Sequence, residues 1–208
     1  MELKDKCIEY FRGNILESFS SYNGWRTILL SRSSTELGSD LANFYVDIQG
    51  KHMHFFVISE RSMLVSFVVL TLQAVDRRRD VFSLLKIDSK KTLNFIQENK
   101  VILDKLKKVR DEIFAHKSQV EIEREIPSMN DIDKYFENLF KFYNQLSLET
   151  DKSVTNFSDG NRIIQDIECA MLNIHRGDAV RKVEVDIKWK SEENPKKLSR
   201  MILGKNIR

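Results

Sequence analysis

The chain of 208 residues is 41% hydrophobic and 31% charged, which predicts a soluble globular protein with one domain, or one domain and a small appendage. Its seven Gly and two Pro are too few for a turn-rich sandwich or barrel, so an all-α fold is favoured. A net charge of +3 does not by itself indicate a nucleic-acid-binding protein, which would need a local basic patch.

The cysteines and the apolar segments bear on the cellular location. Cys7 and Cys169 are isolated from each other in sequence, which fits a reducing cytoplasm with buried thiols; a disulfide between them is the alternative. The first six residues lack the apolar core of a signal peptide. The most apolar run, residues 62–74, carries no charge and is too short to span a bilayer. We therefore expect a cytoplasmic protein without a membrane segment.

The first half of the chain is predicted to form amphipathic helices, because its hydrophobic residues recur at steps of three and four. One helix covers about residues 3–19, is broken at Asn23-Gly24, and is followed by a short helical piece at 25–29. The next helix begins after Ser33 or Ser34 and ends or kinks at Gly50. Its apolar face consists of Leu37, Leu41, Phe44, Tyr45 and Ile48.

The middle of the chain is predicted to hold the most buried helix. From about Lys51 to Val75 the sequence is apolar nearly all round, as is typical of a central core helix. Asp80 is expected to cap a short helix that ends at Lys86. Ser89 is expected to cap a long helix that ends near Lys117.

The clearest predicted helix follows Pro127. Ser128 and Asp131 form a capping box of the S-x-x-D type at its start. Its apolar residues all fall on one stripe: Ile132, Tyr135, Phe136, Leu139, Phe140, Tyr143 and Leu146. After a loop at about 149–160, a last bundle helix is expected over about 161–175, with Gly177 at its C-terminal end.

The C-terminal tail changes its period. Val183, Val185, Ile187 and Trp189 alternate with charged residues, which predicts a β-strand in need of a partner. The tail after Gly177 is basic. The expected architecture is therefore an all-α up-and-down helical bundle over residues 1–177, followed by a basic C-terminal extension over 178–208 with a candidate strand.

The sequence offers little support for a metal or cofactor site. His52 and His54 would lie about 200° apart on a helix, and no His or Cys cluster has the spacing of metal ligands. The chain also lacks a Gly-rich phosphate loop and a G-x-S-x-G motif. We therefore expect neither a metal nor a cofactor.

Two basic segments are candidates for RNA contacts. Arg77, Arg78 and Arg79 stand between two aspartates, so they form either a phosphate-binding group or a solvated, charge-balanced turn. The second segment, residues 105–110, holds four bases in six positions, among them Lys107 and Lys108, and Lys117 follows it. It fits a surface that tracks a nucleic-acid backbone, or equally a solvated helix face with ion pairs at i,i+4.

Arg110 and His116 carry the sharpest chemical signal. Arginine forks onto phosphate oxygens, and histidine exchanges protons near neutral pH, so the two together suit metal-independent cleavage of a phosphodiester. The pair alone is nonspecific, since a surface histidine at a helix end is common. On an ideal helix the two side chains lie about 120° apart. A shared site therefore requires that the helix ends near His116, or that two protomers contribute to it.

In its wider context this motif resembles the HEPN superfamily (higher eukaryotes and prokaryotes nucleotide-binding). Arg110-Asp111-x4-His116 fits its Arg-x(4–6)-His motif, in which a polar residue typically follows the arginine. An apolar helix and the turn at 75–85 precede the motif. An aromatic helix follows it and begins with the sequence Asp-Ile-Asp-Lys-Tyr-Phe, residues 131–136. This order, over about residues 40–147, is similar to that of the HEPN-like proteins grouped with abortive-infection system U of bacteria.

The resemblance implies a helical bundle, a homodimer with two Arg–His pairs at the dimer cleft, and a metal-independent endoribonuclease used as a toxin or in phage defence. It also implies an antitoxin or defence partner protein. Other members of the superfamily are inactive binding modules. In toxins that are silenced by nucleotide transfer, a tyrosine stands two residues after the histidine. Here that position is Ser118, so the same regulation is not expected.

Three functions remain open from the sequence. In the first, His116 is the general base or acid, Arg110 holds the scissile phosphate with Lys107 beside it, and Asp111 orients either one. In the second, the chain is a non-catalytic HEPN-like module that binds RNA or a protein. In the third, it is a plain helical adaptor. Steep weakening of binding between ~50 and ~200 mM salt distinguishes RNA binding from an adaptor.

Overall fold

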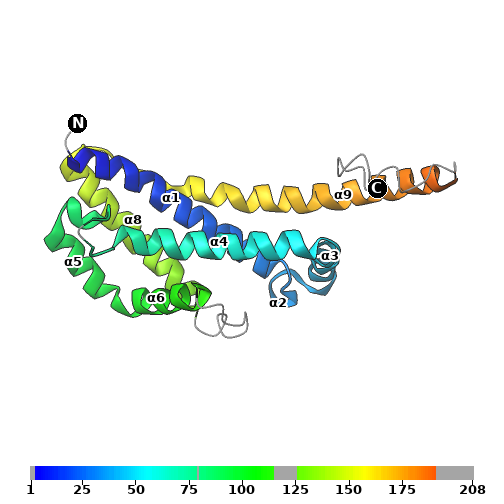
Figure 1. Ribbon diagram of the computed structural model, residues 1–208, viewed down its shortest axis with the longest axis horizontal. Coiled ribbons are helices and arrows are strands. Elements are labelled where there is room, and N and C mark those ends of the chain that lie inside the picture. The colour runs from blue at the N-terminus through cyan, green and yellow to red at the C-terminus, as the bar shows by residue number, and fades with distance from the viewer. Residues whose placement is uncertain (1–2, 79, 115–125, 191–208) are drawn as a thin grey trace, which may run out of the picture. The chain divides into compact units, whose positions relative to one another are not determined.

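The computed structural model describes residues 3–78, 80–114 and 126–190, and the side chains of 112–114 and 184–190 are not described. Within these ranges the chain is helical and contains no strand, which confirms the all-α prediction (Figure 1). It forms two compact units, residues 1–167 and 168–208. The elements are α1 (Leu3–Leu30), α2 (Ser34–Leu37), α3 (Ser39–Lys51), α4 (Met53–Ala74), η1 (Leu84–Lys86), α5 (Ser89–Glu98), α6 (Lys100–Phe114), α8 (Met129–Thr150), η2 (Phe157–Asn161) and α9 (Arg162–Lys190).

The core of the first unit lies between α1, α4 and α8, with α5 and α6 closing one side (Figure 1). The aromatic stripe of α8 is buried as predicted, apart from Phe140, which is half-buried. Ser128 caps this helix by accepting a hydrogen bond from the backbone N–H of Asp131 at 3.2 Å. Local periodicity and capping therefore sufficed to predict α8, whose apolar stripe contributes much of the core.

The predicted break at Asn23-Gly24 is wrong, because α1 runs through it. The Asn23 amide donates hydrogen bonds to the Gly160 carbonyl at 3.2 Å and to Asn161 Oδ1 at 3.1 Å, so it ties α1 to η2. A Cβ at Gly24 would stand 2.7 Å from the Met63 sulfur. Both residues therefore serve contacts with other elements rather than a turn.

A pair of glycine substitutions tests this packing. A Cβ at Gly160 would come within 2.6 Å of the Phe19 ring, whereas a Cβ at Gly13, inside α1, meets nothing within 4 Å. We expect Gly160→Ala to lower the free energy of unfolding by about 1–3 kcal/mol through overpacking. Gly13→Ala should instead raise it by about 0.5–1 kcal/mol, because alanine favours the helix. Urea denaturation measures both, and an equal effect of the two substitutions would contradict the close packing at Gly160.

The predicted helix over 34–50 is divided in two at Gly38, whose φ of 79° lies in the left-handed region that favours glycine. Leu37 and Leu41, expected on its buried face, are exposed.

The helix α4 is likewise less buried than predicted. Its C-terminal half lies in the core, but Phe55 and Ile58 near its start are 56% and 65% exposed. By length and composition α4 qualifies as a membrane-crossing helix, a test that core helices of soluble proteins also pass.

The single long helix predicted from Ser89 onward is two helices, α5 and α6, which meet at Asn99. The Asn99 amide donates to the Phe95 carbonyl at 2.9 Å and so closes the last turn of α5. The N-cap of α5 is Asp88, not Ser89, and it accepts from the backbone N–H of Lys91. Residue 80 does not cap a helix; the short helix η1 begins only at Leu84.

The predicted β-strand at 183–189 is wrong, because α9 continues as an α-helix to Lys190. Apolar and charged residues alternate over only seven positions, which is too few to distinguish a strand from a helix. The apolar positions Val180, Val183 and Ile187 are also spaced by three and four, as on one side of a helix. Gly177, the expected helix end, and the predicted domain boundary beside it lie inside α9. The part of the tail from 191 to 208 lies outside the described residues.

Candidate phosphate-binding site

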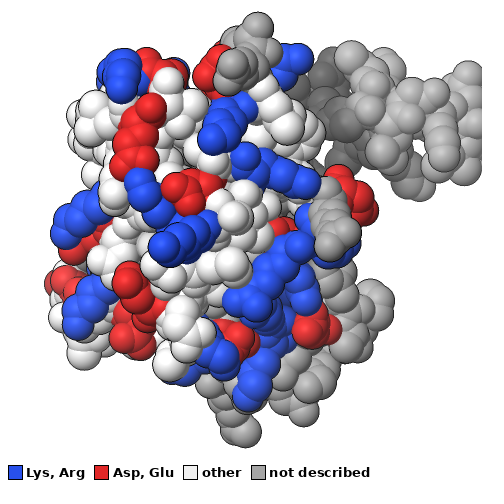
Figure 2. Space-filling model, turned by 90° about the vertical axis from the view of Figure 1, so that its left-hand side faces the viewer, with Lys and Arg blue, Asp and Glu red and all other residues white. Residues whose placement is uncertain are grey.

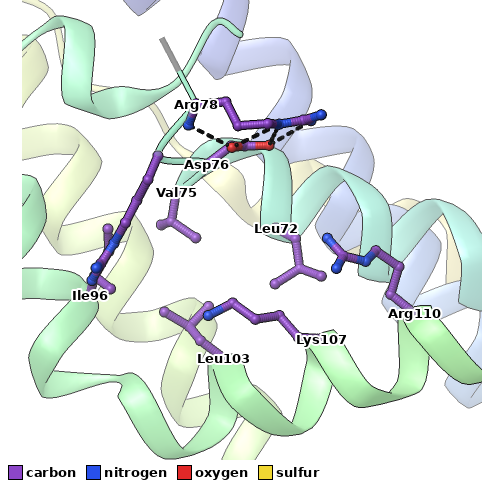
Figure 3. Close-up of a pocket in the computed structure, with 9 residues that line it drawn as sticks. Leu72, Val75, Asp76, Arg78, Ile96, Leu103, Lys107 and Arg110 are labelled. Carbon is purple, nitrogen blue, oxygen red and sulfur yellow. Dashed lines mark hydrogen bonds and ion pairs between the residues drawn. The ribbon is translucent and has the colours of Figure 1, made fainter.

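A pocket of about 500 Å³ lies between the C-terminal end of α4 and the helices α5 and α6 (Figure 3). Its floor is apolar. Leu72 and Val75 point from α4 and its C-cap toward α6, and Ile96 and Leu103 face them from the other side. All four side chains are at least nine-tenths buried. The floor is therefore the edge of the hydrophobic core, and only a small part of its apolar surface is exposed in the pocket.

The walls of the pocket carry four cationic side chains from two separate segments. Arg77 and Arg78 come from the turn after α4, and Lys107 and Arg110 come from α6. Lys107 and Arg110 lie three residues apart, so both project from the same side of the helix toward α4 (Figure 3). The fold thus brings together two basic segments that are about 30 residues apart in the sequence.

The guanidinium of Arg110 is held by its neighbour in sequence. Its Nε and Nη2 donate to the same Asp111 carboxylate oxygen at 2.9 and 2.8 Å. The Arg110 side chain lines the pocket and is 40% exposed. This arrangement orients the arginine but also gives it an anionic partner, with which an incoming phosphate must compete.

Asp76 fixes the opposite wall. Its carboxylate accepts hydrogen bonds from the backbone N–H of Arg78 at 2.9 Å and from Arg78 Nε and Nη2 at 3.1 and 2.8 Å. These bonds from Arg78, and the positive charges of Arg78 and Arg110, hold the pKa of Asp76 below its ordinary value. The carboxylate therefore stays ionised and fixes both the turn and the Arg78 side chain.

The lowered pKa of Asp76 predicts a pH-dependent contribution to stability. A depressed pKa in the folded state stabilises the fold above the pKa of the unfolded chain, and this contribution is lost as the pH falls through the folded-state value. We expect Asp76→Asn to be less stable than the wild type at pH 7, and equally stable in acid below the folded-state pKa of Asp76, where its carboxylate is protonated. Denaturant titrations at both pH values measure the difference. A difference that persists in acid would show that the carboxylate charge is not responsible.

The predicted site residues divide into three groups. Arg77, Arg78, Lys107 and Arg110 share the pocket, and Asp111 contacts Arg110. Lys108 is exposed on α6 and does not line the pocket. Arg79, His116 and Lys117 lie outside the described residues. Figure 2 looks onto the end of the molecule where α4 ends and shows Lys and Arg side chains gathered on part of that face, with acidic side chains among them.

Sequence reasoning missed the floor of the pocket. Leu72, Val75, Ile96 and Leu103 have the periodicity of ordinary core residues, and no local signal distinguishes an apolar residue beneath a pocket. It also treated Asp76 only as a charge that balances the arginines. The capping box of Ser128 and Asp131 and the neighbouring pair Arg110 and Asp111 could be identified from the sequence, because each is formed by residues at most three positions apart.

The described residues contain no group of three or more His, Cys, Asp or Glu side chains placed to hold a metal ion. No family model, curated protein or solved structure matches this chain. The function is therefore argued from the pocket and its charges.

Proposed function

We propose that this protein is a metal-independent endoribonuclease of the HEPN type, in which Arg110 and His116 act on one phosphodiester bond. The observation that carries the proposal is the convergence of Arg110 with Lys107, Arg77 and Arg78 on one pocket. Such a group of cations suits the binding of RNA phosphates. The resemblance of residues 110–116 to the HEPN motif adds a proton-transferring group, His116, which lies outside the described residues.

In the proposed reaction the ribose 2′-oxygen attacks the adjacent phosphorus while the bond from phosphorus to the 5′-oxygen breaks. The products carry a 2′,3′-cyclic phosphate and a free 5′-hydroxyl. His116 accepts the proton of the 2′-hydroxyl or donates a proton to the leaving 5′-oxygen. Arg110 binds the non-bridging oxygens and stabilises the charge that develops on them. Asp111 is a positioning residue, since it holds the Arg110 guanidinium.

The resemblance extends the proposal to the assembly and the biological role. A homodimer would place two Arg110–His116 pairs at one cleft and supply separate groups for the base and the acid. The role of such an enzyme is that of a toxin or phage-defence effector in the cytoplasm, restrained by an antitoxin or a defence partner protein. Sedimentation of the purified protein tests the dimer: a monomer of about 24.5 kDa at micromolar concentration would contradict a site shared between protomers.

The test of the proposed function is cleavage of RNA by the purified protein in EDTA. We expect 2′,3′-cyclic phosphate ends, no cleavage of DNA, and no cleavage of an RNA with a 2′-deoxy residue at the scissile position. His116→Ala should abolish cleavage, while His54→Ala, which changes an exposed histidine of α4, should leave it intact. Equal rates for the wild type and His116→Ala would refute catalysis. RNA binding without any cleavage would instead identify a non-catalytic module.

A further inference from the structure

We propose that the pocket between α4 and α6 receives one unpaired nucleotide of single-stranded RNA, with the base against the apolar floor and its phosphate on the cationic rim. This inference rests on the proposed function only in taking RNA as the ligand, and it does not require that the RNA is cleaved. It assigns a separate task to the pocket, namely the choice of which nucleotide is held beside Arg110.

The first argument is the division of the pocket into two chemical halves. A site for phosphate alone needs cations and N–H donors but no apolar surface. Here four buried hydrophobic side chains form the floor beneath the cations: Leu72, Val75, Ile96 and Leu103. A ligand that covers both halves must combine a flat apolar ring with an anionic group, as a nucleotide does. The volume of about 500 Å³ is within the range of small-ligand pockets.

The second argument is the state of the arginine on the far wall. Asp76 accepts hydrogen bonds from the backbone N–H, Nε and Nη2 of Arg78, so it orients the guanidinium plane, although the Arg78 side chain is 70% exposed. An oriented guanidinium plane offers a surface on which an RNA base stacks. Lys107 and Arg110 stand at the opposite side of the pocket (Figure 3). We assign the phosphate to them, where it competes with their own carboxylate partners, Asp104 at 3.2 Å from Lys107 and Asp111 at 2.8 Å from Arg110.

The third argument concerns the strandedness of the ligand. In a duplex the bases are paired and stacked inside the helix, and moving one base out costs a few kcal/mol. An unpaired base is free to enter the pocket. A rim that contacted only the backbone would bind both forms through their phosphates. The apolar floor therefore predicts a preference for single strands, and the charges alone do not.

The experiment compares ligands on the wild-type protein first, so that no substitution can affect folding. The probes are a short fluorescent 2′-O-methyl oligonucleotide, which resists cleavage, its duplex, and an abasic oligomer with the same number of phosphates. Fluorescence anisotropy should show that the duplex and the abasic oligomer bind about 5- to 100-fold more weakly than the single strand. In competition, a nucleoside monophosphate should displace the single strand at concentrations at which inorganic phosphate does not.

Substitutions then locate the effect in the pocket. Val75→Phe fills the floor and should weaken single-strand binding to the level of the abasic oligomer, whose own binding is unchanged. Val69→Phe, at an exposed valine of α4 that does not line the pocket, should bind as the wild type does. Equal binding of the single strand, duplex and abasic oligomer by the wild type would overturn the inference. It would do so without affecting the proposed cleavage, which is scored separately on ordinary RNA.

Discussion

Replacing Arg110 with alanine is expected to reduce the rate of RNA cleavage by about 10²–10³-fold, the usual cost of removing one group that stabilises charge in the transition state. The guanidinium lies at the pocket with Lys107 beside it, so in the proposed mechanism its loss removes a contact to the reacting phosphate and not a structural support. A single-turnover assay on a defined RNA measures the change. The melting temperature should stay close to that of the wild type, because exposed ion pairs contribute little to stability.

Two further variants make this prediction specific. Arg110→Lys keeps the charge but loses the planar fork, and should give an intermediate rate. Arg162→Ala is the matched control, since Arg162 also pairs with an aspartate close in sequence, Asp159, but is 80% exposed and does not line the pocket. It should cleave as fast as the wild type. Cleavage by Arg110→Ala at the wild-type rate would remove Arg110 from the mechanism.

The largest expected effect on stability is that of Phe136→Ala, which should cost about 3–5 kcal/mol. The Phe136 side chain is 1% exposed and stands at the centre of an aromatic cluster from α1, α4 and α8. Its ring centroid lies 5.0–5.9 Å from those of Phe19, Tyr22, Phe67, Tyr135 and Phe140. Truncation removes buried apolar surface and leaves a cavity that the surrounding rings fill only in part. Denaturant unfolding followed by circular dichroism measures the loss.

Two substitutions in α8 bracket this value. Phe136→Leu keeps most of the volume and should cost less, about 1–1.5 kcal/mol. Leu148→Ala truncates a leucine that is 47% exposed, and should change the free energy of unfolding by no more than about 0.5 kcal/mol. A loss at Phe136 no larger than the loss at Leu148 would mean that the aromatic cluster is not the stabilising centre of the first unit.

The sequence predictions were correct where the structure depends on residues close together in the sequence, and wrong where it depends on contacts between distant residues. The helix α8 was predictable in its start, its stripe and its cap because helical periodicity and capping act over four residues. The break at Asn23-Gly24 was mispredicted, since both residues favour turns locally but make contacts with η2 and α4 in the fold. The strand predicted at 183–189 failed for a related reason, as its short alternation fits a helix equally well.

The same distinction applies to the candidate site. Two arginines after α4 and the Lys107–Arg110 pair were identified from sequence, because each group is contiguous or lies on one helix face. Their convergence on one pocket depends on the packing of α4 against α6, which no local signal encodes. The apolar floor of the pocket and the hydrogen bonds by which Asp76 holds Arg78 likewise could be identified only from the tertiary structure.

By itself, the amino-acid sequence determined the helical class of this protein, the register of its best amphipathic helix and the positions of its basic segments. These properties follow from side-chain types at spacings of one to four residues. Only the tertiary structure decided that Arg77 and Arg78 stand opposite Lys107 and Arg110 above a hydrophobic floor. The physical reason is that this arrangement results from burying the apolar sides of α4 and α6 against each other, and burial depends on the whole chain.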